Sequence, residues 1–348
     1  MPGRRRLLRI HSPRETTIRK GSKGKYRLTD LKSIVERFTG ARVLLLGDTI
    51  LDIYTYGTAM GLSAETPTIV ARRKEVKYSL GGAALVCRNL LELGAAVNFV
   101  TLVGADEEAA HVRGFEAPLL TVRAVSDAGR PTTVKHRFWV DGYKLFQLDQ
   151  REDGPVSAEI AKQVLAQVEE ALEQTDLVVI SDYRHGLLSP QVVTELMQKL
   201  HAAGKLVYVD SQVSQNASNH KLYRGGCVIC LNLREARAID PAFKPALDAS
   251  AFAVLNRELD TDKIVIKLGE EGAMLQEGNR VTQAPANKVT VKDTTGAGDA
   301  FLSAFCLAGL DSPEGALRLG NTWAGLSVQI HGTVPPSKAD LLSAVKES

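Results

Sequence analysis

Short apolar segments alternate with longer amphipathic segments over residues 157–268 of the chain. Apolar runs of four or five residues are typical of buried strands, and apolar positions three and four apart are typical of helices. This alternation predicts an α/β fold, in which a parallel sheet is covered by helices on both faces. The expected strands are 177–180, 206–209, 228–231 and 264–268, and the expected helices are 158–174, 190–203 and 246–259.

The pattern before residue 157 predicts two kinds of structure. One part continues the α/β pattern, with helices at 31–38, 81–93 and about 111–120, and strands at 42–46 and 96–103. The other part is extended. It contains residues 66–76, opened by Pro67, and a hairpin formed by 132–140 and 144–148 about Asp141-Gly142. These extended segments predict a small sheet outside the main one.

Residues 293–301 read Asp-Thr-Thr-Gly-Ala-Gly-Asp-Ala-Phe and join a predicted strand ending at Val291 to a predicted helix at 300–308. The first amides of a helix lack partners within the helix, and the helix dipole favours negative charge there. Because Gly296 and Gly298 have no side chains, a phosphate group can approach the backbone closely. Asp299 adds a carboxylate, which indicates either a helix cap or a group that handles a proton or a metal.

Polar side chains follow several of the predicted strands. Asp48 and Asp52 follow the strand at 42–46, and the later strands are followed by Ser181–Gly186, Asp210 and Asn232–Glu235. A single polar residue at such a place is more often a helix cap or a turn residue. Several of them along one sheet edge predict a binding site, because open α/β sheets bind ligands outside the carboxyl ends of their strands.

The nine residues 293–301 resemble the C-terminal signature of the PfkB/ribokinase family of sugar and nucleoside kinases. Residues 47–52, 81–84 and 232–235 resemble further motifs of that family. The resemblance implies a ribokinase-like, doubly wound and mainly parallel sheet between helices over residues 31–348. It also implies a small β-sheet lid, from about 66–76 and 131–150, that covers the sugar and forms a homodimer. The activity implied is transfer of the ATP γ-phosphoryl group to a hydroxyl of a sugar or sugar phosphate.

The resemblance implies roles for residues at the matching positions. The anion hole would consist of Gly296, Ala297 and Gly298, with Asp299 as the catalytic base. The substrate-binding residues would be Asp48, Asp52, Gly81, Gly82, Arg184 and His185. The nucleotide-binding residues would be Asn232, Lys267, Gly269, Gly272, Thr295 and Asn321. Mg²⁺ would be positioned by Glu235, Asn232 and Asp293, mostly through water. A monovalent cation is a further expected cofactor, beside Mg²⁺ and ATP.

Within the family, residues 47–52, the Ser-Asp-Tyr segment and the helix before the first strand most resemble the heptose-phosphate kinases. Those enzymes phosphorylate the anomeric hydroxyl of a heptose 7-phosphate, which implies D-glycero-D-manno-heptose 7-phosphate as the acceptor. Three residues depart from that pattern: Leu85 replaces an Asn, His185 a Lys and Gln147 an Arg. The alternatives are a nucleoside or other hexose kinase, and a nucleotide- or sugar-binding protein without turnover. A dinucleotide dehydrogenase is disfavoured, because no Gly-x-Gly-x-x-Gly follows the first strand.

Composition bears on the location of the protein. No apolar run approaches the ~18 residues that a membrane span needs, and no secretory signal is visible, so no membrane partner is expected. The chain has 4 cysteines, too few for a disulfide framework, which favours the reducing cytoplasm. Cys227 and Cys230 lie in an apolar run and are interpreted as buried strand cysteines rather than zinc ligands.

Basic residues are concentrated at the start of the chain. Residues 1–30 hold ten lysines and arginines against Glu15 and Asp30, whereas the net charge of the chain is +3. We expect this segment to be a flexible, solvated leader ahead of the kinase domain. Nucleic acid is not expected as its partner, because aromatic residues interleaved with the basic ones, which would stack on bases, are nearly absent.

Overall fold

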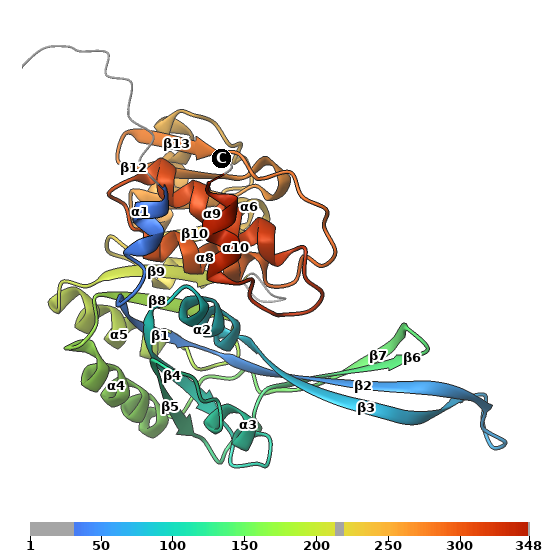
Figure 1. Cartoon of the computed structure of the whole chain (residues 1–348). Helices are drawn as coiled ribbons and strands as arrows, with labels where there is room; N and C mark the ends of the chain where they lie inside the picture. The colour runs from blue at the N-terminus through green and yellow to red at the C-terminus, as the bar shows by residue number, and fades with distance from the viewer. Residues whose placement is uncertain (1–30, 213–218, 347–348) are drawn as a thin grey trace, which may run out of the picture.

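The computed structural model describes residues 31–212 and 219–346, and it contains a large sheet, flanking helices and a smaller second sheet that projects away from them (Figure 1). The expected α/β architecture is confirmed. The basic segment 1–30, for which we expect a flexible leader, lies outside the described residues.

The main sheet has the strand order β13-β12-β11-β10-β9-β8-β1-β4-β5. All neighbouring pairs from β11 to β5 are parallel, while β12 and β13 form an antiparallel edge. From β1 the chain builds outward to β5, then returns to the other side of β1 and builds outward again. The strand order therefore reverses between β1 and β8, where such sheets bind ligands. The strands are β1 (Arg42–Gly47), β4 (Ala96–Val103), β5 (Leu120–Ser126), β8 (Leu177–Asp182), β9 (Leu206–Ser211), β10 (Val228–Asn232), β11 (Lys263–Lys267), β12 (Ala273–Glu277) and β13 (Arg280–Ala284).

Helices cover both faces of the main sheet. Side chains alternate along each strand, so that in β1 Leu44 and Leu46 face one helical layer while Val43 and Leu45 face the other. The first layer contains α4 (Ala158–Leu172), α5 (Pro190–Ala202), α6 (Leu233–Ile239) and α7 (Ala253–Leu259). The second contains α1 (Leu31–Glu36), α2 (Ala83–Glu92), α8 (Ala297–Ala308), α9 (Pro313–Ser327) and α10 (Lys338–Ala344).

The second sheet, which we call the lid, has the order β3-β2-β6-β7. Its strands are β2 (Thr49–Leu62), β3 (Ile69–Gly82), β6 (Val134–Val140) and β7 (Tyr143–Gln150). The hairpin predicted about Asp141-Gly142 is confirmed, and both turn residues have positive φ, at 48° and 85°. In Figure 1, β2 and β3 form a long ribbon that extends away from the helical layers.

Two predictions about the root of the lid are wrong. Asp48 and Asp52 do not both simply follow the strand at 42–46, because β1 extends to Gly47, β2 begins at Thr49 and Asp52 lies within β2. Residues 49–56 are rich in β-branched and aromatic types, which favours a strand. Gly81 and Gly82 end β3 instead of opening a helix, and α2 begins at Ala83.

Other boundaries also differ from the prediction. The helix expected at 111–120 is the shorter α3 (Ala109–Arg113), and the missed edge strand β5 follows it. The helix expected at 246–259 begins as a 3-10 turn, Ala249–Phe252, and becomes α7 only at Ala253.

The segment before residue 293 was also predicted wrongly. No strand runs to Val291, because residues 285–296 are irregular after the missed hairpin of β12 and β13. Beyond α8 the chain forms α9, which begins at Pro313 behind a Ser312 cap and ends at Ser327.

All four cysteines are buried and free of disulfide bonds: Cys87, Cys227, Cys230 and Cys306. The prediction that Cys227 and Cys230 are buried is confirmed. Within the two described stretches of chain, no helix combines the length and apolar character that crossing a membrane demands.

Candidate active site

A cavity of about 450 Å³ lies among the carboxyl ends of the central strands, the N-terminus of α8 and the root of the lid. Ser181, Asp210, Asn232 and Lys267 line it from the last two positions of β8, β9, β10 and β11. The polar strand ends therefore meet at one sheet edge, as their places in the sequence predicted. The lining also includes Asp52, Gly81, Gly82, Leu85, Lys135, Arg137, Tyr183, Gln212, Arg234, Glu235, Thr295, Gly296, Gly298, Asp299 and Thr333.

The N-terminus of α8 borders the cavity with little side-chain cover. Gly296 is the N-cap with φ +80°, a conformation that favours glycine, and a Cβ there would overlap the side chain of Leu85. Gly298 also lines the cavity. The N–H of Ala297 donates to the carbonyl of Thr294 at 3.2 Å, so this amide closes the turn. Bare first-turn amides and the helix dipole make this place suitable for a phosphate.

Asp299 lies in the first turn of α8, and its carboxylate accepts hydrogen bonds from the hydroxyl of Tyr183 at 2.9 and 2.8 Å. Burial raises the pKa of Asp299 and the nearby Asp210 raises it further, while Tyr183 and Lys267 oppose them, so the pKa is about 7. A carboxyl group with this pKa is suited to exchange protons near neutral pH.

Lys267 provides a fixed positive charge beside the same helix end. It forms an ion pair with Asp210, and a Cβ on Gly298 would lie 3.4 Å from its Nζ. Burial lowers the pKa of Lys267, but Asp210 and Glu235 raise it above the ordinary lysine value, so the ammonium group stays charged. A charge held in this way can stabilise an anion in the cavity without reorganisation.

Asn232 and Glu235 form a capping box at the start of α6. The Asn232 side chain accepts from the Glu235 N–H at 2.9 Å, and the Glu235 carboxylate accepts from the Asn232 N–H at 2.7 Å. Both residues line the cavity. Among the described residues, no three His, Cys, Asp or Glu side chains form a metal-binding group. A metal ion held here would therefore keep waters and bind substrate oxygens, as Mg²⁺ does.

The lid contributes a charged cluster to the other end of the cavity. Asp52 is buried and ion-paired with Arg137 of the neighbouring strand β6, whose guanidinium carbon also lies 5.2 Å from the ring centroid of Tyr54. Lys135 is two residues before Arg137 and lines the same cavity. A Cβ on Gly81 would overlap the Asp52 carboxylate, so glycine is required at this position.

Asp48, Arg184 and His185 do not line the cavity. Asp48 instead fixes the turn after β8, because its carboxylate accepts the N–H groups of Tyr183 at 3.0 Å and His185 at 3.3 Å. Burial and the neighbouring Asp182 raise the pKa of Asp48 to about 7. Burial lowers the pKa of His185 to about 4.

Besides Ala297, whose amide closes the turn before α8, four further predicted residues lie outside the cavity lining. Asp293 accepts the N–H groups of Thr295 and Gly332, and Asn321 donates to the carbonyls of Ala284 and Pro285. Gly272 packs against the backbone of 284–286, and Gly269 opens the 3-10 turn Gly269–Glu271. In the structure all four organise turns around the site, and their predicted ligand contacts stay predictions.

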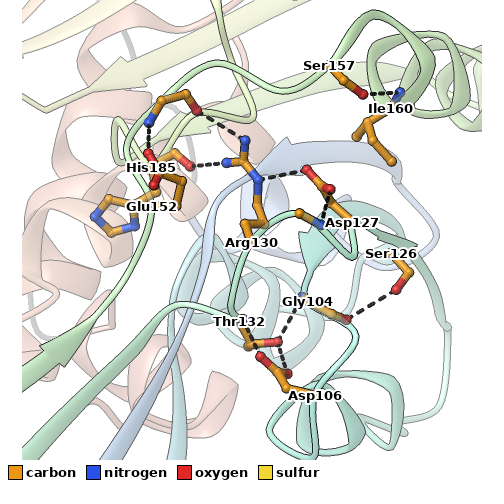
Figure 2. A network of polar contacts seen from close by, with 12 residues as sticks. Gly104, Asp106, Ser126, Asp127, Arg130, Thr132, Glu152, Ser157, Ile160 and His185 are labelled. Carbon is orange, nitrogen blue, oxygen red and sulfur yellow. Dashed lines mark hydrogen bonds and ion pairs between the residues drawn. The ribbon is translucent and has the colours of Figure 1, made fainter.

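A polar network joins the root of the lid to the turn after β8 (Figure 2). Arg130 donates to Asp127 at 2.9 Å, to the carbonyl of His185 at 3.2 Å and to the carbonyl of Gly154 at 3.1 Å. Arg130 lies just before β6 and Gly154 just after β7. These contacts therefore hold both ends of the β6–β7 hairpin against the loop of His185. A Cβ on Gly186 would overlap the Gly154 carbonyl oxygen, so this close approach requires glycine.

Tyr183, Lys135, Arg137 and Gln212 are among the cavity residues that were missed as site residues. The Lys-x-Arg spacing in a predicted lid strand was a usable signal, because alternate residues share one face of a strand. Tyr183 lies within a segment that the sequence analysis singled out, but no pattern indicated that its hydroxyl reaches Asp299.

Comparison with known proteins identifies the family. Residues 41–340 match the model of the "pfkB family carbohydrate kinase". The chain belongs to this family. Carbohydrate kinases are phosphotransferases with an alcohol acceptor, and ATP is the usual co-substrate of the family. The prediction of a PfkB-type kinase from residues 293–301 is thus confirmed.

Individual relatives of this PfkB kinase agree with that result. It is 30% identical over 335 residues to "Bifunctional protein HldE" of Paramagnetospirillum magneticum, and the match spans 91% of this chain but 66% of that protein. The ribokinase of Arabidopsis thaliana, solved with ribose and ATP, has a TM-score of 0.69 at 20% identity over 89% of this chain and 100% of its own. A mutant of Escherichia coli phosphofructokinase-2 has a TM-score of 0.70 at 20% identity, over 89% of this chain and 99% of its own. The ribokinase-like fold with its lid is therefore confirmed.

The close approach at Gly186 predicts a large effect on stability. Gly186 has φ +89° and Gly40 has φ +87°, but only at Gly186 would a Cβ meet other atoms. We expect Gly40→Ala to lower the free energy of unfolding by ~1–2 kcal/mol through backbone strain alone. Gly186→Ala should lower it by a further ~1–3 kcal/mol, because the new methyl group overlaps the Gly154 carbonyl. Urea unfolding measures both changes, and equal losses would show that the approach tolerates a side chain.

Proposed function

We propose that the protein is an ATP-dependent sugar kinase that transfers the γ-phosphoryl group of ATP to a hydroxyl of a sugar or sugar phosphate. The observation that best supports this proposal lies at the start of α8. There a glycine-lined helix N-terminus adjoins the carboxylate of Asp299, whose pKa is about 7. A helix end of this kind binds the transferring phosphoryl group, and the carboxylate accepts the proton of the attacking hydroxyl. An anion site does not need a neighbouring carboxylate, and a helix-capping carboxylate does not need an anion site. Phosphoryl transfer to a hydroxyl needs both, one for the phosphoryl group and one for the proton.

In this mechanism Asp299 is the general base, and the backbone around Gly296 and Gly298 stabilises charge on the phosphoryl oxygens. Lys267, held by Asp210, adds a positive charge on the same side. Asn232 and Glu235 would hold Mg²⁺, largely through waters, and the bound ion neutralises negative charge on the phosphates. The lid carries Asp52, Lys135 and Arg137 to the acceptor side, and its closure over the sugar excludes water as a competing acceptor.

For the acceptor we propose a phosphorylated sugar, D-glycero-D-manno-heptose 7-phosphate, attacked from its anomeric hydroxyl. The relatives named "Bifunctional protein HldE", from the heptose-7-phosphate kinase branch of the family, support this choice. Lys135 and Arg137 support it as well, because two cations at the acceptor end of the cavity suit a phosphate group. Leu85, which lines the cavity where the branch has an Asn, removes a polar contact to the sugar. The alternatives are therefore a nucleoside or other hexose kinase, and a binding protein without turnover.

Further aspects of the proposal concern the surroundings of the enzyme. A monovalent cation is proposed as a second activator, and the cytoplasm as the compartment. We also propose a homodimer through the lid, because large apolar side chains are exposed on it. Met60, Leu62, Phe146 and Leu148 are each more than half exposed, which is unusual for a surface without a partner.

Replacing the proposed base tests the kinase reaction. Asp299→Asn should lower kcat by ~10²–10⁴-fold, because the side chain can no longer accept the proton, while ATP binding measured by calorimetry persists. The substrate panel consists of heptoses, hexoses, their phosphates and nucleosides, each assayed for Mg²⁺-dependent ADP release. Asp311→Asn, at an exposed position beyond α8, is the matched control. Wild-type protein that binds ATP but releases no ADP with any acceptor would favour the binding-protein alternative.

Lys135→Gln tests the preference for a phosphorylated acceptor. We expect KM for the sugar phosphate to rise about tenfold or more, because a charge-assisted hydrogen bond to phosphate is lost, while KM for ATP is unchanged. Lys77→Gln is the control, since Lys77 is an exposed lid lysine that pairs with Glu75 outside the cavity. Equal KM values in the two variants would show that Lys135 does not meet the phosphate.

The proposed dimer is tested by mass measurement in solution. Phe146→Asp places a charge on the exposed face of β7 and should convert the dimer to a monomer at micromolar concentration. Leu247→Asp is the control, because Leu247 is at least as exposed as Phe146 but lies outside the lid. A monomeric wild-type protein, or a dimer that survives Phe146→Asp, would contradict the proposed interface.

A further inference from the structure

The hydroxyl of Tyr183 contacts both oxygens of the Asp299 carboxylate, at 2.9 and 2.8 Å. Both residues line the cavity, so this hydrogen bond lies where the acceptor hydroxyl must arrive. A tyrosine hydroxyl can donate one hydrogen, and it therefore shares that hydrogen between the two oxygens. The remaining lone pairs of the carboxylate stay available for an acceptor hydroxyl.

Tyr183 is held in place by its own backbone. Its N–H donates to the buried carboxylate of Asp48, and the next N–H in the turn, that of Arg184, donates to Asp182 at 2.9 Å. Arg130 fixes the same turn from the other side through the carbonyl of His185. The turn is thus tied to β1, to its own strand β8 and to the root of the lid, which leaves the ring little freedom to move away from Asp299.

We propose that Tyr183 is a positioning residue for the catalytic base: its hydroxyl orients the Asp299 carboxylate and stabilises its ionised form, the form that accepts the proton. This inference rests on the proposed function of Asp299 and adds a residue that the sequence motifs did not indicate. Burial and Asp299 hold the pKa of Tyr183 well above its usual range, so the phenol stays protonated and remains a donor.

The charges around Asp299 explain why a donor is needed. Asp210 disfavours a second negative charge, and Lys267, which favours it, is already paired with Asp210. From the lid, Asp52 adds a further negative charge that faces Tyr183. A hydrogen bond to an ionised group stabilises that form and lowers the pKa of its acid. Without Tyr183 the carboxylate would thus need a higher pH to ionise.

The first test is a double-mutant cycle on the free energy of unfolding, with Tyr183→Phe, Asp299→Ala and the double variant at pH 6 and pH 8. It needs no substrate, and so it is independent of the proposed reaction. At pH 8 the two side chains should be coupled by about a tenfold change in the folding equilibrium constant, as a hydrogen bond to a charged group predicts. The coupling should be weaker at pH 6, where the carboxyl group is largely protonated. Absence of coupling at pH 8 would overturn the inference, whether or not the protein is a kinase.

The second test is the pH profile of kcat/KM. The wild-type profile should fall below about pH 7, because a protonated Asp299 cannot act as a base. In Tyr183→Phe this acid limb should move upward by about one pH unit, with a roughly fivefold loss at pH 7 that is largely recovered at high pH. A purely structural role would lower the whole profile without moving the limb, and this result would also overturn the inference.

Two other tyrosines provide controls for the loss of a buried hydroxyl. Tyr208 is fully buried in β9 and its hydroxyl has no hydrogen-bond partner among the described residues, so Tyr208→Phe should change neither activity nor the limb. The Tyr223 hydroxyl donates to Asp182 at 2.8 Å, away from the base. Tyr223→Phe should lower stability but leave the limb in place. A limb that moves as far in Tyr223→Phe as in Tyr183→Phe would show that the shift arises from general loosening, against our inference.

Discussion

The site depends on one electrostatic constraint: the N-terminus of α8 must remain open to an anion while a carboxylate stands beside it. The glycines at 296 and 298 keep the helix end uncovered, and the reversal of strand order between β1 and β8 provides the crevice into which it opens. A negative side chain beside an anion site is unfavourable unless the surrounding charges are balanced. Lys267 offsets it with a positive charge and Tyr183 with a hydrogen bond. Lys267 is held by Asp210 of β9, and Tyr183 by Asp48, which joins β1 to β2.

The fold was largely predictable because its signals are local. Short apolar runs and amphipathic segments indicate the alternation of strands and helices along the chain. Parallel strands then bring their carboxyl ends to one edge of the sheet, independently of the loop conformations. The motif at 293–301 was predictable for a related reason, since all its parts are adjacent in the chain. Because these residues are neighbours in the chain, their spacing alone was enough to predict a bare helix N-terminus beside a carboxylate.

The missed features depend on long-range packing. Strand β2 pairs with β3 and β6, and nothing near Asp52 in the sequence shows that both partners exist. Residues 288–292 alternate polar and apolar side chains like a strand, yet the main sheet already ends at β13. The side chain of Asn321 donates instead to the carbonyls of 284 and 285. The link between Tyr183 and Asp299 spans 116 positions, so no local pattern could indicate it.

The way the lid joins the core has a mechanical consequence. Only Asp48 separates β1 from β2, and β3 runs into α2 without a loop, so this side of the lid has no flexible hinge segment. The core end of its strands β2 and β3 contains Asp52 and leads into α2. In α2 the side chain of Leu85 occupies the space beside Gly296. In the proposed mechanism, movement of the long ribbon would therefore shift Leu85 beside the phosphoryl site as well as Asp52 on the acceptor side. Binding of the acceptor and the shape of the proposed phosphoryl pocket would thus depend on the same two strands.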